Sequence, residues 1–108
     1  MSSAVIVGPD EHDVAEALEE EGFAVTTTAI GNRPALEEAG IHEAEVYVLT
    51  DIDQATSITV AHDLNDAVRV VVFADGTLPE FATRQTDLLV DPALLDARAV
   101  AEELAREV

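Results

Sequence analysis

The chain of 108 residues contains no cysteine, no lysine and no tryptophan. Without cysteine it has no disulfide, no thiolate metal site and no cysteine nucleophile. Five arginines stand against 23 acidic residues, so there is no basic stripe to neutralise phosphates, and nucleic acid is excluded as a partner. No long hydrophobic run is present, the first covering only residues 4–7. We therefore expect no signal peptide, no membrane insertion and a cytoplasmic location.

The apolar content is nevertheless sufficient for a folded core. Hydrophobic residues make up 48% of the chain and fall in compact runs, so the net charge of −18 does not imply disorder. A chain of this length can build one three-layer core and leaves no room for a second domain. We expect a single Rossmann-like α/β domain over residues 1–108.

The surface charge predicts a dependence on salt. An acidic chain without lysine resembles the proteins of salt-accumulating halophilic archaea. In molar salt the Debye length falls to about 3 Å, whereas at low salt self-repulsion opposes the compact state. We interpret the charge as surface adaptation and expect folding to require high salt.

Five short apolar runs alternate with helical patterns, as in a parallel sheet with helical crossovers. The predicted strands are residues 4–7, 23–28, 45–49, 68–73 and 87–90. They predict a three-layer Rossmann-like or flavodoxin-like α/β sandwich with a five-stranded parallel sheet. The order 2-1-3-4-5 is favoured because only five strands are available, and it puts the switch point between the first and third strands.

The loops at this switch point, residues 8–12 and 50–53, define the predicted ligand site. Its residues are Gly8, Pro9, Asp10, His12, Thr50, Asp51 and Asp53. Gly8 and Thr50 would offer backbone and hydroxyl donors to a ligand phosphate, and His12 would donate to it or act as a base. The alternatives are two tight turns and a solvated histidine. No catalytic residue and no cofactor is assigned.

Four acidic residues, Asp10, Glu11, Asp51 and Asp53, are expected at the same edge of the sheet. One hypothesis is a Mg²⁺ site built from carboxylates and waters. The preferred one is that Asp10 and Asp53 cap helices and the other two are surface acids, because acidic caps are common. In the same way, Asp91 followed by proline predicts the start of the last helix.

Three segments, residues 36–45, 48–53 and 86–92, resemble the TrkA-N (RCK-type) nucleotide-binding domain of potassium-transport regulators. These short segments are spread over the stretch from residue 36 onward, about two-thirds of the chain by length. The resemblance implies a Rossmann-like fold with a nucleotide site. The glycine-rich loop of that family is reduced here to residues 8–13. Asp10 stands at the second glycine position, and the acids around it would repel a pyrophosphate.

A weaker resemblance is to response-regulator receiver domains. Asp51, at the end of the third predicted strand, is similar in place to their phosphoacceptor aspartate, and Asp10 with Glu11 to their acidic pair. Receivers hold the phosphoryl group with a lysine after the fifth strand, where this chain has Asp91 and Pro92. We therefore expect no phosphoryl transfer.

Two functions remain open. One is a non-catalytic module that binds a nucleotide or small anionic ligand, or regulates a partner. The other is an interaction or scaffold domain that self-associates, for example as a homodimer, after losing its ligand site. The chain is also similar to short halophile proteins labelled as CTP synthetase, which suggests an accessory role in nucleotide metabolism. It has no Gly-x-x-x-x-Gly-Lys motif and no cysteine, so it does not perform that reaction alone.

Overall fold

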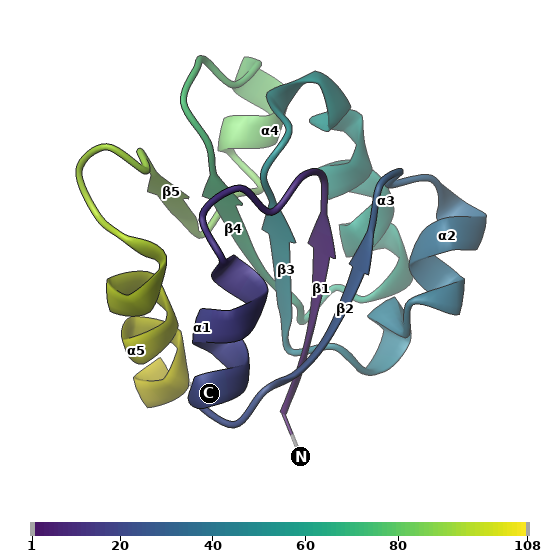
Figure 1. Ribbon diagram of the computed structural model, residues 1–108. Coiled ribbons are helices and arrows are strands. Elements are labelled where there is room, and N and C mark those ends of the chain that lie inside the picture. Colours follow the sequence, from purple (N-terminus) through teal and green to yellow (C-terminus); the bar gives the residue numbers. More distant parts are fainter. Residues whose placement is uncertain (1, 108) are drawn as a thin grey trace.

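The computed structural model describes residues 2–107 as a five-stranded sheet with helices on both faces (Figure 1). The strands are β1 (Ser3–Val7), β2 (Ala24–Thr28), β3 (Val46–Leu49), β4 (Arg69–Phe73) and β5 (Leu88–Val90). They are ordered β2-β1-β3-β4-β5, and each strand is parallel to its neighbours. The predicted flavodoxin-like architecture and strand order are confirmed.

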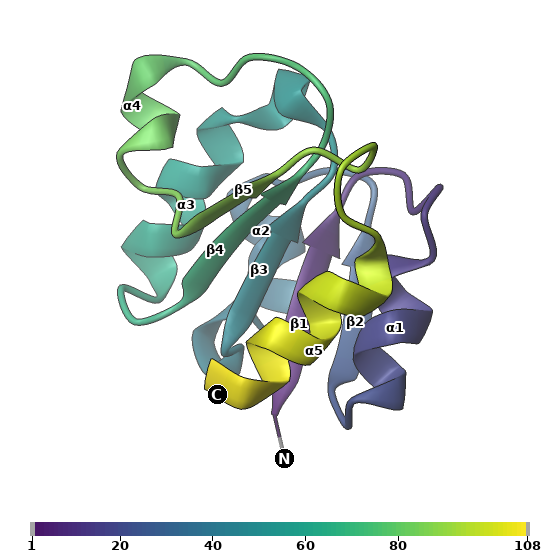
Figure 2. The ribbon, with the colours of Figure 1, turned by 90° about the vertical axis from the view of Figure 1, so that its left-hand side faces the viewer.

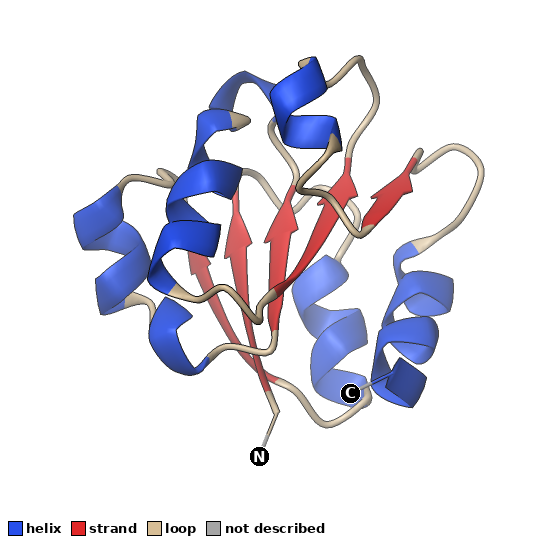
Figure 3. Cartoon of the chain, turned by 180° about the vertical axis from the view of Figure 1, so that it is seen from behind, coloured by secondary structure: helices blue, strands red, loops and turns tan. Residues whose placement is uncertain are grey.

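The helices form two layers around this sheet. They are α1 (Val14–Glu20), α2 (Arg33–Glu38), α3 (Thr56–Leu64), α4 (Glu80–Thr83) and α5 (Ala97–Glu107), with 3₁₀ turns η1 (Ile41–Glu43) and η2 (Ile52–Gln54). α1 and α5 lie side by side on one face (Figure 2). α2, α3 and α4 cover the other (Figure 3). No helix within residues 2–107 has the length and apolar character needed to cross a membrane.

The sheet separates two apolar cores, because alternate residues of each strand face opposite layers. Ile6 of β1 and Val48 of β3 belong to a buried cluster with residues of α1 and α5. Val7 and Tyr47 belong to a second cluster with residues of α2 and α3. Burying one such aliphatic side chain contributes about 1.5–3 kcal/mol, so both layers are needed to hold the fold.

The first helix begins later than its sequence indicates. α1 starts at Val14, and Asp13 before it has φ 57° and makes no side-chain cap bond. The carboxylate of Asp10 reaches forward instead and accepts hydrogen bonds from the backbone N–H groups of Val14 (2.7 Å) and Ala15 (3.0 Å). The prediction of Asp10 as the N-cap residue is therefore wrong in position, although Asp10 does satisfy two of the helix's free donors.

The predicted start of the last helix is also wrong. The carboxylate and carbonyl of Asp91 close a single turn, and the chain then leaves the helical path. α5 begins at Ala97, where the carboxylate of Asp96 accepts from the N–H of Ala99 at 2.9 Å. A second aspartate with better placed neighbours has taken the capping role.

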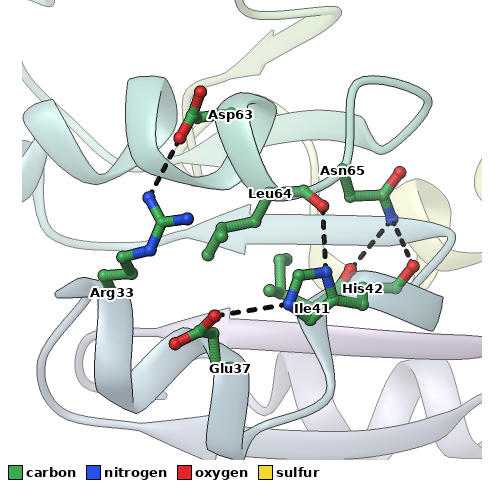
Figure 4. Close-up of polar contacts among 7 residues, drawn as sticks. All are labelled: Arg33, Glu37, Ile41, His42, Asp63, Leu64 and Asn65. Atoms are coloured by element: carbon green, nitrogen blue, oxygen red, sulfur yellow. Dashed lines mark hydrogen bonds and ion pairs between the residues drawn. The ribbon is translucent and has the colours of Figure 1, made fainter.

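Polar contacts join α2, η1 and α3 at the surface (Figure 4). The amide of Asn65, which ends α3, donates to the carbonyl oxygens of Ile41 (2.9 Å) and His42 (3.4 Å). The ring Nδ1 of His42 lies 3.1 Å from the carbonyl oxygen of Leu64, so that nitrogen carries the proton and donates. These bonds fix the segment before β3 against the end of α3.

Candidate functional site

A hollow of about 560 Å³ lies at the edge of the sheet where the parallel strands end. We call it the carboxyl-edge hollow. Its lining includes five of the predicted site residues, Pro9, His12, Thr50, Asp51 and Asp53. Gly8 and Asp10 are not among its lining residues; with Pro9 they border a second hollow next to β2. The two loops at the switch point therefore meet as expected, but they bring together only part of the predicted set.

Gly8 and Thr50 form hydrogen bonds that tie the loop after β1 to the neighbouring strands. Gly8 has φ +108°, and its N–H donates to the carbonyl oxygen of Thr28 at 3.0 Å. The hydroxyl of Thr50 lies 2.7 Å from the carbonyl oxygen of Pro9 and 3.2 Å from that of Val7. Both donors predicted to serve a ligand phosphate thus have acceptors within the chain. The two groups predicted as phosphate ligands instead bond the end of β1 to its two neighbours, Gly8 to β2 and Thr50 from the end of β3.

Asp51 and Asp53 have roles different from those predicted. Asp53 does not cap α3; it lies inside η2, and its N–H donates to Oδ1 of Asp51 at 3.1 Å. The other carboxylate oxygen of Asp51 accepts from Nε2 of Gln54 at 3.2 Å. Gln54 also bonds Gly31 N–H (2.8 Å) and the carbonyl of Ala29 (2.8 Å), which ties the loop after β2 to η2. Asp51 is therefore a structural cap with both oxygens engaged.

The four acids of the hypothetical Mg²⁺ site do not form a metal-binding group. Within residues 2–107 no three His, Asp or Glu side chains gather closely enough to hold a metal ion. Asp10 and Asp51 already accept hydrogen bonds from backbone or side-chain donors. The preferred hypothesis is supported for Asp10 as a capping side chain. It is wrong for Asp53, because α3 begins after Ala55 without a side-chain cap, and Asp51 caps η2 instead.

The carboxyl-edge hollow is strongly acidic. Its charged lining consists of Glu11, Asp51, Asp53, Asp75 and Asp91, with His12 as its only basic side chain among the described residues. The arginines are ion-paired elsewhere, as Arg33–Asp63, Arg69–Glu107, Arg84–Glu80, Arg98–Glu102 and Arg106–Glu103. An anion entering the hollow would meet like charges and no free guanidinium.

Aromatic and acidic lining residues from the ends of β4 and β5 are not predicted by the sequence as part of the site. The ring of Phe73 meets that of His12 edge to face, with centroids 5.6 Å apart and planes at 85°. Asp75 and Asp91 follow the ends of β4 and β5. The signal that could have found them is positional, because every residue just after a parallel strand lies at the same edge of the sheet.

Parallel strands in the order 2-1-3-4-5, with polar loops gathered at their carboxyl ends, define a flavodoxin-like domain of the kind found in CheY-like receivers. The chain belongs to DUF7126, a family of unknown function whose model matches residues 4–104. No curated protein matches it in sequence.

Solved receiver structures share this fold. A CheY-like receiver domain from Methanospirillum hungatei has a TM-score of 0.73 and 18% identity, over 99% of this chain and 93% of that one. An orphan response regulator of H. pylori has a TM-score of 0.75 and 12% identity, over 97% and 94%. A Burkholderia pseudomallei response regulator was solved with a phosphorylated aspartic acid, calcium ion and citrate. It has a TM-score of 0.67 and 21% identity, over 99% of this chain and 72% of that one. Identities this low establish the fold alone.

These neighbours support the receiver resemblance and not the TrkA-N one. The physical reason is visible in the segments that carried the TrkA-N resemblance. Residues 36–45 fold as the end of α2 and η1, and residues 86–92 as β5 with its flanking turns. Such elements lead into and out of strands in any parallel α/β sheet. A resemblance in these segments therefore indicates the fold class and does not indicate which ligand is bound.

Proposed function

We propose that this chain is a non-catalytic, receiver-like module that acts by binding a partner and does not transfer phosphoryl groups. The observation that carries the proposal is the state of Asp51, at the place of the receiver phosphoacceptor. Both of its carboxylate oxygens accept hydrogen bonds inside η2, from Asp53 N–H and from Gln54. An attacking carboxylate would have to give up these bonds.

The charge around Asp51 supports the same conclusion. The chain has no lysine to hold a transferred phosphoryl group, and Asp91 and Pro92 stand after β5. A phosphoryl group on Asp51 would add about 1.5–2 negative charges to a hollow lined by four further acids. Since no guanidinium lines the hollow to offset this charge, the phosphorylated state is destabilised.

Mass spectrometry tests the proposal. The folded protein in molar KCl is incubated with acetyl phosphate and Mg²⁺, beside a receiver known to accept phosphoryl groups. The expected result is an unchanged intact mass for this chain and a phosphorylated species for the control receiver. A phosphorylated species that disappears in Asp51→Asn would overturn the proposal.

A small-molecule site in the carboxyl-edge hollow is the second candidate, with Pro9, His12, Thr50, Asp51 and Asp53 as its proposed residues. The observation in its favour is that these residues border one hollow of about 560 Å³ at the switch point. The acidic lining opposes a bare nucleotide or other anion. It fits a nucleotide better when Mg²⁺ accompanies it, because Mg²⁺ is commonly held by one or two carboxylates together with substrate phosphates.

A thermal-shift panel in molar KCl tests this second candidate with NAD⁺, NADH, ATP, CTP and AMP, each with and without Mg²⁺. A ligand at 100 times its dissociation constant stabilises the fold by about 2.7 kcal/mol. A shift that needs Mg²⁺ and is lost in His12→Ala would support the site. A flat response across the panel would exclude the nucleotide hypothesis and leave the interaction module.

A further inference from the structure

The outer edge of β2 is the least charged part of this acidic molecule. Residues 22–32 contain no charged side chain, and they form the longest uncharged stretch of a chain with a net charge of −18. Within it, β2 occupies the end of the sheet, with β1 as its only neighbouring strand (Figure 1). Proteins usually protect such an edge with charged residues, proline or a bulge. β2 has none of these in its register with β1.

The register of β2 shows which backbone groups face outward. Ala24 N–H donates to the carbonyl oxygen of Ser2, and Gly8 N–H donates to the carbonyl oxygen of Thr28. Because every second residue of a parallel strand bonds a given neighbour, the residues that bond β1 are the first, third and fifth of β2. Val25 and Thr27 therefore turn their N–H and C=O groups toward the open edge.

We propose that β2 pairs with β2 of a second copy of this chain, antiparallel and across a two-fold axis, to form a continuous ten-stranded sheet. A two-fold axis through Thr26 places Val25 opposite Thr27 of the second copy, and Thr27 opposite Val25 of the second copy. Each of these pairs exchanges two main-chain hydrogen bonds, four in all, and the two Thr26 side chains face each other. A strand of this composition is complementary to itself, which a two-fold interface requires.

The absence of charge favours this edge for contact between two copies of the chain. Two chains of −18 repel each other, and the repulsion is smallest where their closest residues carry no charge. β2 is also rich in β-branched residues, with Val25 followed by three threonines, of which Thr26 and Thr27 are exposed. Ile30, just beyond the strand, is 57% exposed and would be covered by the second copy.

The oligomeric state and its response to one charge test the proposal. In molar KCl, sedimentation equilibrium is expected to give about twice the 11.5 kDa of one chain. Thr26→Lys places two charged side chains opposite each other across the axis, where pairing would remove them from water as well as bring like charges together. This variant is therefore expected to sediment as a monomer even in molar KCl. Thr77→Lys makes the same charge change in an exposed loop away from β2 and is expected to remain a dimer.

Hydrogen exchange of the unmodified protein provides a readout that does not depend on a variant folding. The amides of Val25 and Thr27 are expected to gain protection as the protein concentration rises, while that of Leu89 on the opposite edge strand does not. A monomer at all concentrations, a dimer that Thr26→Lys leaves intact, or a dimer broken by Leu89→Lys would each overturn the proposal. None of these outcomes bears on whether Asp51 accepts a phosphoryl group, so the two proposals fail separately.

Discussion

Gly8 lies so close to Thr50 that a Cβ atom on Gly8 would fall 2.4 Å from the threonine Oγ1. This contact joins the ends of β1 and β3 at the centre of the sheet. Gly8 also has φ +108°, a conformation that other residues adopt only with strain. Two separate requirements therefore keep glycine at this position, one steric and one conformational.

Gly8→Ala is accordingly expected to lower the free energy of unfolding by about 2–4 kcal/mol, measured by denaturant titration. Gly22→Ala is the matched control, because Gly22 also has positive φ but no atom within 4 Å of the added Cβ. Gly22→Ala should lower the free energy of unfolding only through the strain of a positive φ, by about 1–2 kcal/mol. In a Thr50→Ala background, Gly8→Ala should cost less than in the unmodified chain. If Gly8→Ala costs the same stability with and without Thr50→Ala, the contact with Thr50 is not the cause of the loss.

Asp10→Ala is expected to destabilise the fold by about 1–2 kcal/mol, because it removes the acceptor for the N–H groups of Val14 and Ala15. Asp10→Asn keeps one acceptor oxygen, so its stability should lie between that of the unmodified protein and that of Asp10→Ala. Glu11→Ala removes an exposed neighbouring acid that makes no cap bond and should change stability by less than about 0.5 kcal/mol. Equal effects of the alanine changes at 10 and 11 would contradict the capping role.

The buried hydroxyl of Tyr47 makes stability sensitive to alkaline pH. Its environment raises the pKa of Tyr47 from 10.0 to about 12, chiefly through burial, with the hydrogen bond to Ser57 opposing the rise. The unfolded chain therefore ionises first. Stability is complete below pH 10 and falls by about 1.4 kcal/mol per pH unit up to about pH 12. Tyr47→Phe should abolish this decline.

Tyr47 is the only tyrosine in the chain, so tyrosinate absorbance follows it without interference. The folded protein should titrate near pH 12 and the urea-unfolded protein near the ordinary value of 10. A folded-state titration at the ordinary value would show that the hydroxyl is accessible to solvent.

The end of α1 offers a test of the salt dependence. Glu19, Glu20 and Glu21 are exposed at the C-terminus of this helix, where negative charge opposes the helix dipole. Replacing all three by glutamine should raise stability by about 1 kcal/mol in dilute buffer and by almost nothing in molar KCl. The unmodified chain should itself become more stable as KCl is added. Equal gains at both salt concentrations would argue against electrostatic repulsion as the cause.

The sequence predicts the strands of this fold better than it predicts the helix boundaries. Buried parallel strands are continuous apolar runs, and such runs are few enough here to set both their positions and their order. The starts of α1 and α5 depend on aspartate side chains, and several aspartates stand near the starts of α1, α3 and α5. Asp91 lost the expected role to Asp96, which caps α5. Asp53 lies inside η2, and α3 begins after Ala55 with no side-chain cap.

The candidate site was predictable in place but not in chemistry. Topology brings the loops of His12 and Asp53 to one edge, and that follows from the strand order. Whether a side chain there is free or already bonded depends on distant partners. Gln54 engages Asp51 and the backbone of Gly31, which lies 23 residues away in the chain. No local pattern reports such a bond.

The two cores on either side of the sheet share no buried side chain. Substitutions of Leu104, on the buried face of α5, and of Ile58, on the buried face of α3, should therefore have additive effects on stability. In evolutionary terms, each face of the sheet is free to drift in sequence without the other having to adjust. We therefore expect sequence differences between relatives of this family in one helical layer to be independent of differences in the other.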